Sequence, residues 1–403
     1  MARERLVVVG NGMAGLRFLE DLLARAPDRY DIAVVGAEPD AAYNRVLLSS
    51  LLAGEIAPAD VRMQPRAWYA ENGVTLTTGD RATAIDTAAR AVQLERGGAL
   101  SFDKLVLATG SEPVRLLVSG SDLPGVMTFR TLADVDDLRR RAAGGRAAVV
   151  IGGGLLGIEA AHGLVRCGLS VTLVHLMDRL MERQLDTDGA GLLAEAIAAK
   201  GVRVLLGAQT RAVRGDGRAE ALELADGRVI DCDLVVMAVG IRPSTALAAA
   251  AGLRIGRGIL VDDRMQTSVD GIYAIGECAE HRGTCYGIIE PCYDQARVAA
   301  CAIAGQPEAG YAGSVPATNL KVSGVPVFSV GDFEAASAEV VLVRDTATPS
   351  YRKLVLRDGC LTGAVLVGDT TDAFWYADLI RAGAPIAAFR ETLAFGRSFS
   401  EAA

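Results

Sequence analysis

Residues 6–23 read LVVVGNGMAGLRFLEDLL, an apolar run that continues through three glycines into a segment with helical periodicity. Gly10, Gly12 and Gly15 have the GxGxxG spacing of a strand-to-helix turn that binds a pyrophosphate. The first glycine permits a tight turn, the second lets the backbone approach the phosphates, and the third lets the helix pack on the strand. The stretch therefore predicts a turn that places an anionic phosphate at the positive end of a helix.

A single turn of this kind is weak evidence, but the next apolar strand supports it. Residues 30–38, YDIAVVGAE, end in Glu38, which follows Gly15 by 23 residues. A carboxylate at about that distance accepts a hydrogen bond from a ribose hydroxyl of a bound dinucleotide. We therefore predict a dinucleotide-binding unit in the N-terminal part of the chain.

The pattern recurs in AAVVIGGGLLGIEAAHGL, residues 147–164, where Gly152, Gly154 and Gly157 precede another apolar strand, SVTLVH, at 170–175. Two such units predict two dinucleotide sites, and two sites in one chain imply that electrons pass between two cofactors. Two further apolar strands end in small-residue turns, which would let the backbone approach a cofactor. They are LVLATGSEP (105–113) and LVVMAVGIRP (234–243), and a later buried strand, GIYAIGECAE (271–280), ends in an acid, Glu277.

In combination, these strings resemble the flavin-dependent pyridine nucleotide oxidoreductases. Within them, the chain is most similar to the N-terminal flavin portion of assimilatory NAD(P)H nitrite reductases, over about residues 5–395. The strings that carry this resemblance are NGMAGLRFLEDL (11–22), YNRVLLSS (43–50), GGGLLGIEAA (152–161), YAIGECA (273–279) and GAVLVGDTTD (363–372). The cofactors that it implies are FAD on the first unit and NADPH or NADH on the second.

The resemblance implies an α/β fold with two Rossmann-like dinucleotide-binding domains and a C-terminal α+β domain. The FAD-binding domain would take residues 1–115 and 245–312, the inserted NAD(P)H-binding domain 116–244, and the C-terminal interface domain 313–403. Strands of the last domain are read in VPVFSVGDF (325–333), RKLVLRDG (352–359) and LTGAVLVGD (361–369). The segment AGQPEAGYAGSVP, residues 304–316, predicts a linker.

The resemblance also implies individual site residues. Glu159 would lie beside the nicotinamide and the flavin, and Arg45 near the flavin phosphates and ring, so both are predicted to be catalytic. Glu277 would bind a ribityl hydroxyl. The predicted cofactor-binding residues are Gly10, Gly12, Met13, Ala14, Gly15, Glu38, Arg45, Ser49, Ala82, Thr109, Gly110, Arg130, Gly152, Gly154, Leu155, Gly157, Glu159, His175, Arg179, Gly240, Gly276 and Glu277.

Glu159 also has a purely structural explanation. An acid in the first turn of a helix stabilises it by about 0.3–1 kcal/mol, because it opposes the helix dipole. We favour the functional role because the start of this helix and the cofactor site coincide in the motif.

The nucleotide preference depends on the end of the strand at 170–175. An acid there would bind the free hydroxyls of NADH, but the sequence has His175. Arg179 and Arg183 follow closely and are suited to a phosphate. The sequence therefore predicts that NADPH is accepted at least as well as NADH.

The seven cysteines are an odd number, and only four apolar residues precede the first glycine, too few for the core of a signal peptide. We therefore expect reduced thiols. Four of the cysteines have the spacing CX6CX6CX8C, which matches no usual iron-sulfur or zinc pattern, so no metal site is predicted. These four are Cys278, Cys285, Cys292 and Cys301.

Composition narrows the class of partner. The net charge of -8 argues against nucleic acid, which is bound mainly by clustered Lys and Arg. No apolar run reaches the roughly 18 residues of a membrane span, so we expect no membrane partner and a cytoplasmic protein. Neither GxSxG nor HExxH occurs, and hydrolase chemistry therefore has no support.

The stretch YNRVLLSS, residues 43–50, bears on the electron acceptor. Disulfide reductases that resemble this chain have cysteines around this place, whereas here Arg45, Ser49 and Ser50 stand without a sulfur. A flavin takes two electrons as a hydride and can release them one at a time. We therefore predict an NAD(P)H-dependent FAD oxidoreductase that passes electrons to the metal centre of a partner protein in nitrite or nitrate assimilation.

The closing residues AFRETLAFGRSFSEAA contain no cysteine for a cluster, so we expect that metal centre on a separate protein. The candidates are a nitrite or nitrate reductase subunit, a ferredoxin or a rubredoxin, docked against residues 313–403, where Lys321 offers a positive charge. One alternative is a ferredoxin or rubredoxin reductase that serves an oxygenase system. Another, from a different class, is a flavin-bearing redox sensor whose partner reads its conformation.

Overall fold

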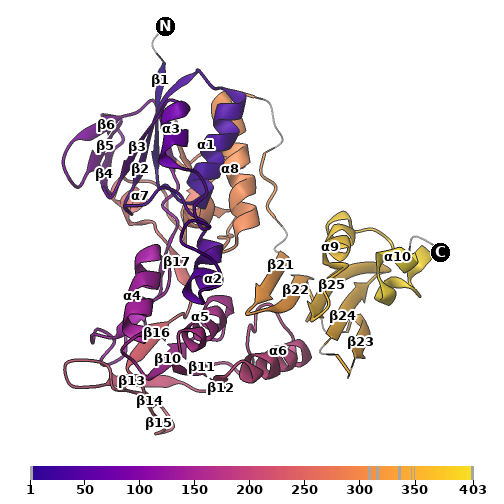
Figure 1. The fold of residues 1–403 in the computed structure, drawn as a ribbon. Helices are drawn as coiled ribbons and strands as arrows, with labels where there is room; N and C mark the ends of the chain where they lie inside the picture. Colours follow the sequence, from indigo (N-terminus) through magenta and orange to yellow (C-terminus); the bar gives the residue numbers. More distant parts are fainter. Residues whose placement is uncertain are drawn as a thin grey trace. The chain divides into compact units, whose positions relative to one another are not determined.

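The computed structural model describes residues 3–306, 310–314, 317–334, 337–345, 347–348 and 350–400 (Figure 1). The chain forms two compact units. The first unit comprises Met1–Leu48, Ala57–Pro113 and Ile241–Ser314, and the second comprises Ser49–Ile56, Val114–Gly240 and Val315–Ala403. The three domain boundaries expected from the sequence stay a prediction.

Five parallel strands form the central sheet of the first unit, in the order β19-β7-β1-β2-β3. The strands are β1 (Glu4–Val9), β2 (Tyr30–Gly36), β3 (Val74–Thr78), β7 (Lys104–Leu107) and β19 (Ile272–Ala274). The order reverses at β1, because β2 lies on one side of it and β7 on the other. In open α/β sheets, ligands bind beyond the carboxyl ends of the strands at such a reversal.

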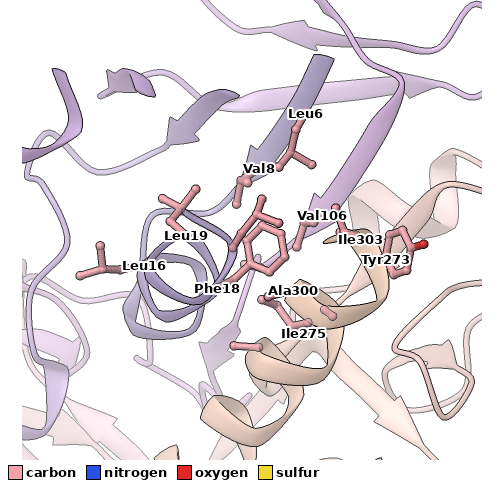
Figure 2. Packing of buried hydrophobic residues seen from close by; sticks show 14 of the residues in the cluster. Leu6, Val8, Leu16, Phe18, Leu19, Val106, Tyr273, Ile275, Ala300 and Ile303 are labelled. Atoms are coloured by element: carbon pink, nitrogen blue, oxygen red, sulfur yellow. The ribbon is translucent and has the colours of Figure 1, made fainter. Parts of the chain in front are cut away.

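Both faces of this sheet are buried, as the uninterrupted apolar run of β1 predicts. Leu6 and Val8 face α1 (Met13–Arg25) and α8 (Ile289–Ala304), which pack side by side (Figures 1 and 2). Phe18 of α1 is fully buried between them. Val7 and Val9 face the opposite side, where β4, β5 and β6 form a small antiparallel sheet.

The remaining elements of the first unit are short. Besides the small sheet, two strand pairs, β8-β17 and β18-β20, complete it. These elements are β4 (Ala82–Asp86), β5 (Ala91–Leu94), β6 (Ala99–Ser101), β8 (Ser111–Pro113), β17 (Ile241–Pro243), β18 (Ile259–Val261), β20 (Ala279–His281), α3 (Arg66–Glu71), α7 (Ala246–Ala250), η1 (Arg45–Leu47) and η2 (Gly276–Cys278). After η1 the chain continues in α2 (Leu48–Leu52).

The second unit contains another five-stranded parallel sheet, in the order β12-β11-β10-β16-β9. Its strands are β9 (Val126–Thr128), β10 (Ala147–Ile151), β11 (Ser170–Val174), β12 (Val202–Leu205) and β16 (Leu234–Met237). The helices are α4 (Leu132–Ala142), α5 (Leu155–Arg166) and α6 (Thr187–Ala199), and β13 (Thr210–Arg214), β14 (Ala221–Leu224) and β15 (Val229–Asp231) form a small antiparallel sheet. The expected second Rossmann-like arrangement is therefore present.

The C-terminal part of the second unit is an antiparallel sheet in the order β21-β22-β25-β24-β23. Its strands are β21 (Ala317–Val322), β22 (Val325–Gly331), β23 (Glu339–Asp345), β24 (Ser350–Arg357) and β25 (Cys360–Val367), followed by α9 (Ala373–Ala382), η3 (Ala387–Phe389), η4 (Leu393–Phe395) and α10 (Arg397–Ser400). The predictions of β22, β24 and β25 are confirmed, whereas β21 and β23 were missed.

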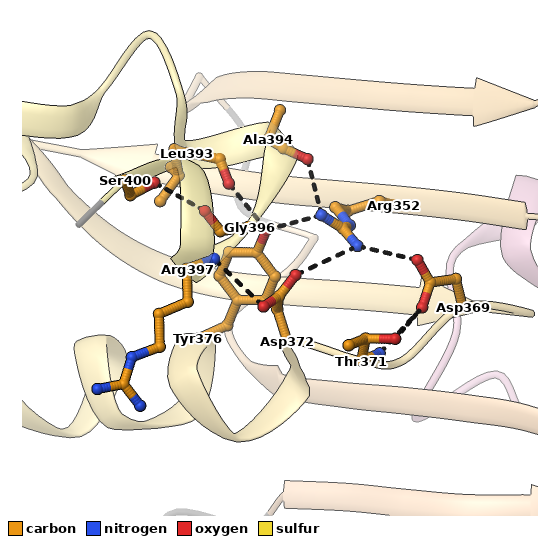
Figure 3. A network of polar contacts seen from close by, with 10 residues as sticks. All are labelled: Arg352, Asp369, Thr371, Asp372, Tyr376, Leu393, Ala394, Gly396, Arg397 and Ser400. Carbon is orange, nitrogen blue, oxygen red and sulfur yellow. Dashed lines mark hydrogen bonds and ion pairs between the residues drawn. The ribbon is translucent and has the colours of Figure 1, made fainter. Parts of the chain in front are cut away.

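A nearly buried arginine holds the C-terminal elements together (Figure 3). The Arg352 guanidinium donates to the Tyr376 hydroxyl at 3.1 Å and to the Ala394 carbonyl at 2.7 Å. It also pairs with the carboxylates of Asp369 at 3.3 Å and Asp372 at 3.7 Å. One side chain from β24 therefore joins α9, η4 and the turn after β25.

Candidate functional site

In the first glycine turn, an added Cβ would collide with the backbone at two of the three glycines and would meet open space at the third. Gly10 has φ +112°, and a Cβ there would lie 2.1 Å from the carbonyl oxygen of Ala108. A Cβ at Gly15 would lie 2.3 Å from the carbonyl oxygen of Gly10. No described atom lies within 4 Å of a Cβ placed at Gly12. Gly10 and Gly15 are thus required by packing, whereas Gly12 leaves the room that an approaching pyrophosphate needs.

A buried polar atom lies in the same turn. The Asn11 side-chain oxygen accepts from the Tyr69 hydroxyl at 3.0 Å, but its amide nitrogen has no hydrogen-bond partner in the described part of the chain. Buried donors normally have partners. The unmet donor and the space at Gly12 together fit a bound phosphate-containing cofactor.

Several predicted residues meet at the carboxyl ends of β7 and β19. The Glu277 carboxylate accepts from the Ser111 hydroxyl at 2.8 Å, and Thr109 donates to the Ser244 carbonyl at 2.9 Å. Gly276 has φ +79°, and a Cβ there would approach the Ala14 methyl to 3.0 Å. Gly110, also at positive φ, faces the Glu277 carboxylate. The structure thus brings Glu277 to the edge of the sheet where the glycine turn lies.

Arg45 joins Glu38 through a tyrosine that the sequence reading missed. The Tyr43 hydroxyl donates to Glu38 at 2.5 Å and accepts from Arg45 at 2.8 Å, and the Arg45 guanidinium also pairs with Glu38. Burial alone would lower the pKa of Arg45, but Tyr43 and Glu38 outweigh it and raise the pKa, with Glu277 adding to the effect. Arg45 therefore keeps its charge, which suits a phosphate-bearing ligand at this edge.

Two further predicted residues of the first unit lie at element ends. Met13 begins α1 and is buried, and Ala82 is the first residue of β4 and is half-buried. The proposed cofactor contacts of both stay predictions.

The second glycine turn repeats the geometry of the first. A Cβ at Gly152, which has φ +118°, would lie 2.2 Å from the Ala238 carbonyl oxygen, and one at Gly157 would lie 1.9 Å from that of Gly152. Gly154, directly before Leu155 at the start of α5, has no described atom within 4 Å of a Cβ. Gly240 has φ +112°, and no described atom lies within 4 Å of a Cβ placed there either. The second unit thus has its own space for a pyrophosphate.

His175 and Arg179 lie near this turn, but their polar atoms are engaged within the protein. His175 Nδ1 accepts from the Gly153 backbone amide at 2.9 Å, and Nε2 lies 3.1 Å from the Glu182 carboxylate. The Arg179 guanidinium donates to Glu334 at 2.5 Å and to the Leu185 carbonyl at 3.2 Å. Neither side chain is free to meet a phosphate in this conformation.

Glu159 lies in α5 beyond its first turn, which contains no acid, so the expected place in the first turn is wrong. Its side chain lies beside residues 49–56. Burial raises the pKa of its carboxyl to about 7; a hydrogen bond from Ser49 opposes this rise, and the charge of Glu55 adds to it. The same segment packs on α5, since a Cβ at Gly163 would lie 2.9 Å from the Leu52 side chain. The predicted residues Ser49 and Glu159 are therefore in contact.

A thiol does lie near this segment. The Cys167 side chain donates to the Leu52 carbonyl at 3.5 Å, and burial raises the pKa of the thiol although Arg139 opposes the rise. A protonated, partly buried thiol is a poor nucleophile. Cys167 therefore does not supply the reactive sulfur that residues 43–50 lack.

The other predictions are placed as follows. Arg130 precedes the capping box of α4, and its backbone amide donates to Asp134 at 2.8 Å. Among the described residues, no three His, Cys, Asp or Glu side chains gather as metal ligands, and no disulfide joins any of the seven cysteines. Lys321 belongs to β21, but its side chain lies outside the described part of the structure. No helix in the described ranges is long and apolar enough to cross a membrane.

Two glycine turns with open central glycines, each at the end of a parallel sheet, define a two-nucleotide oxidoreductase of the Rossmann type. The chain belongs to the pyridine nucleotide-disulphide oxidoreductase family, whose model matches residues 4–303. The C-terminal domain of rubredoxin NAD+ reductase matches residues 316–384. Family membership confirms the expected fold class and the cofactors, FAD and NAD(P)H.

Three comparisons specify the resemblance. The chain is 45% identical to a nitrite reductase [NAD(P)H] of Bacillus subtilis (strain 168), over 92% of this chain and 46% of that protein. It is 42% identical to an assimilatory nitrate reductase electron transfer subunit of the same strain, over 92% and 48%. The chain thus spans about half the length of these curated relatives. A solved covalent putidaredoxin reductase-putidaredoxin complex is similar in fold, with TM-score 0.87, 26% identity and coverage of 99% of this chain and 97% of that one.

Proposed function

We propose that this chain is a cytoplasmic NAD(P)H-dependent FAD oxidoreductase that serves as the electron-transfer subunit for assimilatory nitrite or nitrate reduction. The observation that carries the proposal is the pair of open glycine turns, one in each unit, at Gly12 and Gly154. The names of the two Bacillus relatives support the choice of pathway.

Different residues of the first unit bind different parts of FAD. Gly12 admits the pyrophosphate, Glu38 binds the adenosine ribose, and Arg45 supplies a positive charge for the phosphates. Glu277, held by Ser111, binds a ribityl hydroxyl. Bound FAD supplies hydride acceptance and the release of single electrons.

The residues of the second unit bind and orient the nucleotide that delivers the hydride. Gly154 admits its pyrophosphate, and Glu159 orients its nicotinamide. Because the pKa of Glu159 is about 7, its carboxyl exchanges a proton near neutral pH. Orientation of the two reacting groups is a large part of such catalysis.

The alternative, a ferredoxin or rubredoxin reductase of an oxygenase system, is favoured by two observations. Residues 316–384 match the C-terminal domain of rubredoxin NAD+ reductase, and the solved relative is a reductase bound to putidaredoxin. Continuous oxidation of NAD(P)H distinguishes a redox sensor from both enzymes, because a sensor does not need it.

The proposal is tested by mixing the protein with NADH or NADPH and nitrite, with and without a sirohaem-bearing nitrite reductase subunit. We expect nitrite loss only with the subunit. Nitrite loss without it would contradict the electron-transfer role. A rate that depends on a nitrate reductase subunit and nitrate would assign the protein to nitrate reduction, and reduction of rubredoxin or ferredoxin alone would favour the alternative.

A further inference from the structure

Residues 175–185 fold back onto the second glycine turn and use both backbone groups of Gly153. The Gly153 amide donates to His175 Nδ1 at 2.9 Å, and its carbonyl accepts from the Met181 amide at 2.9 Å. Met181 adopts φ +50°, an uncommon conformation for a residue with a side chain. The His175 ring and the Leu180 side chain lie where a Cβ at Gly153 would fall, at 2.6 and 2.8 Å. The segment is therefore fixed against the turn.

These contacts determine where the proton of His175 lies. Because Nδ1 accepts from a backbone amide, the neutral ring carries its proton on Nε2. Nε2 then donates to the Glu182 carboxylate at 3.1 Å. The His175 side chain is 10% exposed, whereas the Glu182 side chain is 26% exposed. The buried ring thus holds a partly accessible carboxylate beside the turn.

A Rossmann unit recognises the adenosine ribose with residues at the end of its second strand, which is β11 in this unit. An acid there binds the free hydroxyls of NADH, and a nearby arginine accommodates the 2'-phosphate of NADPH. His175 is the first residue after β11, but both of its ring nitrogens are already used. The negative charge at this place comes from Glu182.

Arg179, a basic residue of the same segment, is bonded to other groups of the protein. Arg179 Nη2 donates to Glu334 at 2.5 Å and to the carbonyl of Glu182 at 3.4 Å, and Nε donates to the Leu185 carbonyl. A guanidinium with three such partners does not meet a 2'-phosphate unless these bonds break. Arg183 follows Glu182 directly and is exposed, whereas Glu182 is the residue that bonds to His175.

We propose that Glu182, positioned by His175, recognises the adenosine ribose of NADH and disfavours the 2'-phosphate of NADPH, so that the protein prefers NADH. The inference rests on the proposed function, because it takes the second unit as the nicotinamide nucleotide site. It differs from the sequence-based expectation for NADPH, which rested on the lack of an acid at position 175 and on Arg179 and Arg183 as partners for a phosphate.

The test measures the affinity of the oxidised, FAD-loaded protein for NAD+ and NADP+ by titration calorimetry. The wild type should bind NAD+ at least tenfold more tightly than NADP+. Glu182→Gln, which keeps the volume, should weaken NAD+ binding by roughly tenfold, the value of one hydrogen bond to a charged group, and narrow the difference between the nucleotides. Asp178→Asn removes the same charge from a side chain of the segment that is 80% exposed and pairs with Arg179 at 3.6 Å, and it should leave the ratio unchanged.

His175→Asn separates the two contacts of the ring. Its side-chain oxygen can still accept from Gly153, but it cannot reach Glu182 as Nε2 does, so NAD+ selectivity should fall while the FAD content of the first unit stays as in the wild type. Tighter binding of NADP+ by the wild type, or an equal change of the ratio in Asp178→Asn and Glu182→Gln, would overturn the inference. Flavin reduction by either nucleotide would leave the proposed function intact in those cases. Failure to bind either nucleotide would contradict both.

Discussion

Ser49 donates a hydrogen bond to Glu159, the predicted catalytic acid of α5. Burial is the largest influence on this carboxyl and raises its pKa to about 7, and the nearby charge of Glu55 acts in the same direction. Ser49 works against both, because its hydroxyl stabilises the carboxylate. The helix that follows the second glycine turn thus carries a group that titrates at neutral pH.

This balance predicts opposite shifts for two variants. Ser49→Ala should raise the pKa of Glu159 further, and Glu55→Gln should lower it. The carboxyl stretch in infrared difference spectra, wild type minus Glu159→Gln, measures the titration and should show an inflection near pH 7 in the wild type. Shifts in the same direction for both variants would refute the account of this pair.

The sign of the linkage follows from the raised pKa. The folded state binds the Glu159 proton more tightly than the unfolded state, so this group favours the folded state fully at low pH. That contribution is lost as pH rises from the unfolded pKa, near 4.5, through about 7. The melting temperature of Glu159→Gln should therefore rise relative to that of the wild type across this window.

Gly12 and Gly15 should respond differently to a side chain. A Cβ at Gly12 meets no described atom within 4 Å, so Gly12→Val should fold and unfold at the same temperature as FAD-stripped wild type, but purify with little FAD. Gly15→Val would collide with the carbonyl of Gly10 and should be largely insoluble. Stoichiometric FAD in Gly12→Val, measured by absorbance after release, would show that the first turn is not the pyrophosphate site.

Arg352 should stabilise the C-terminal sheet. Its removal in Arg352→Ala takes the guanidinium from the Ala394 carbonyl and from the carboxylates of Asp369 and Asp372, and should cost about 1–3 kcal/mol. Urea unfolding is followed by the fluorescence of Trp375, with the chain's other tryptophan removed by Trp68→Phe. Arg352→Lys should lose less, because one ammonium can replace part of the network; an Arg352→Ala protein as stable as its parent would exclude the role.

The kind of electron acceptor follows from the absence of sulfur in residues 43–56. They contain no cysteine, and the nearby Cys167 thiol has a raised pKa. With NADH, the protein should reduce ferricyanide at least roughly a hundredfold faster than oxidised glutathione, since disulfide exchange requires a thiolate. Comparable rates would contradict this account, and their loss in Cys167→Ala would identify the sulfur responsible.

The glycine turns could be predicted from the sequence, because the spacing of the glycines indicates where the backbone leaves no room for a Cβ. Gly10 and Gly15 are at contacts that exclude a Cβ, and Gly12 is open, as the spacing indicates. Ser111 and Tyr43, which hold the acids Glu277 and Glu38, were missed, because their contacts depend on how loops bring side chains together. A tyrosine five residues after Glu38 is the only signal that could have indicated one of them.

The role of His175 as a cofactor-binding residue stays a prediction. Its residue type could not indicate that both ring nitrogens are bonded within the folded segment, because those contacts depend on the Gly153 turn and on Glu182. In the C-terminal sheet, β22, β24 and β25 are mostly buried apolar runs and were predicted. β23 reads EVVLVRD and is largely exposed at an edge, so its pattern does not report a buried face.

The relay between two nucleotide sites is tested most directly by anaerobic stopped-flow mixing of the FAD-loaded protein with one equivalent of NADH, while the flavin absorbance band is recorded. The wild type should bleach rapidly. Gly154→Val, in which a side chain fills the open space of the second turn, should keep its FAD and stay oxidised with NADH, yet bleach fully with dithionite. Equally fast bleaching of Gly154→Val by NADH, or a wild type that stays yellow, would contradict the account.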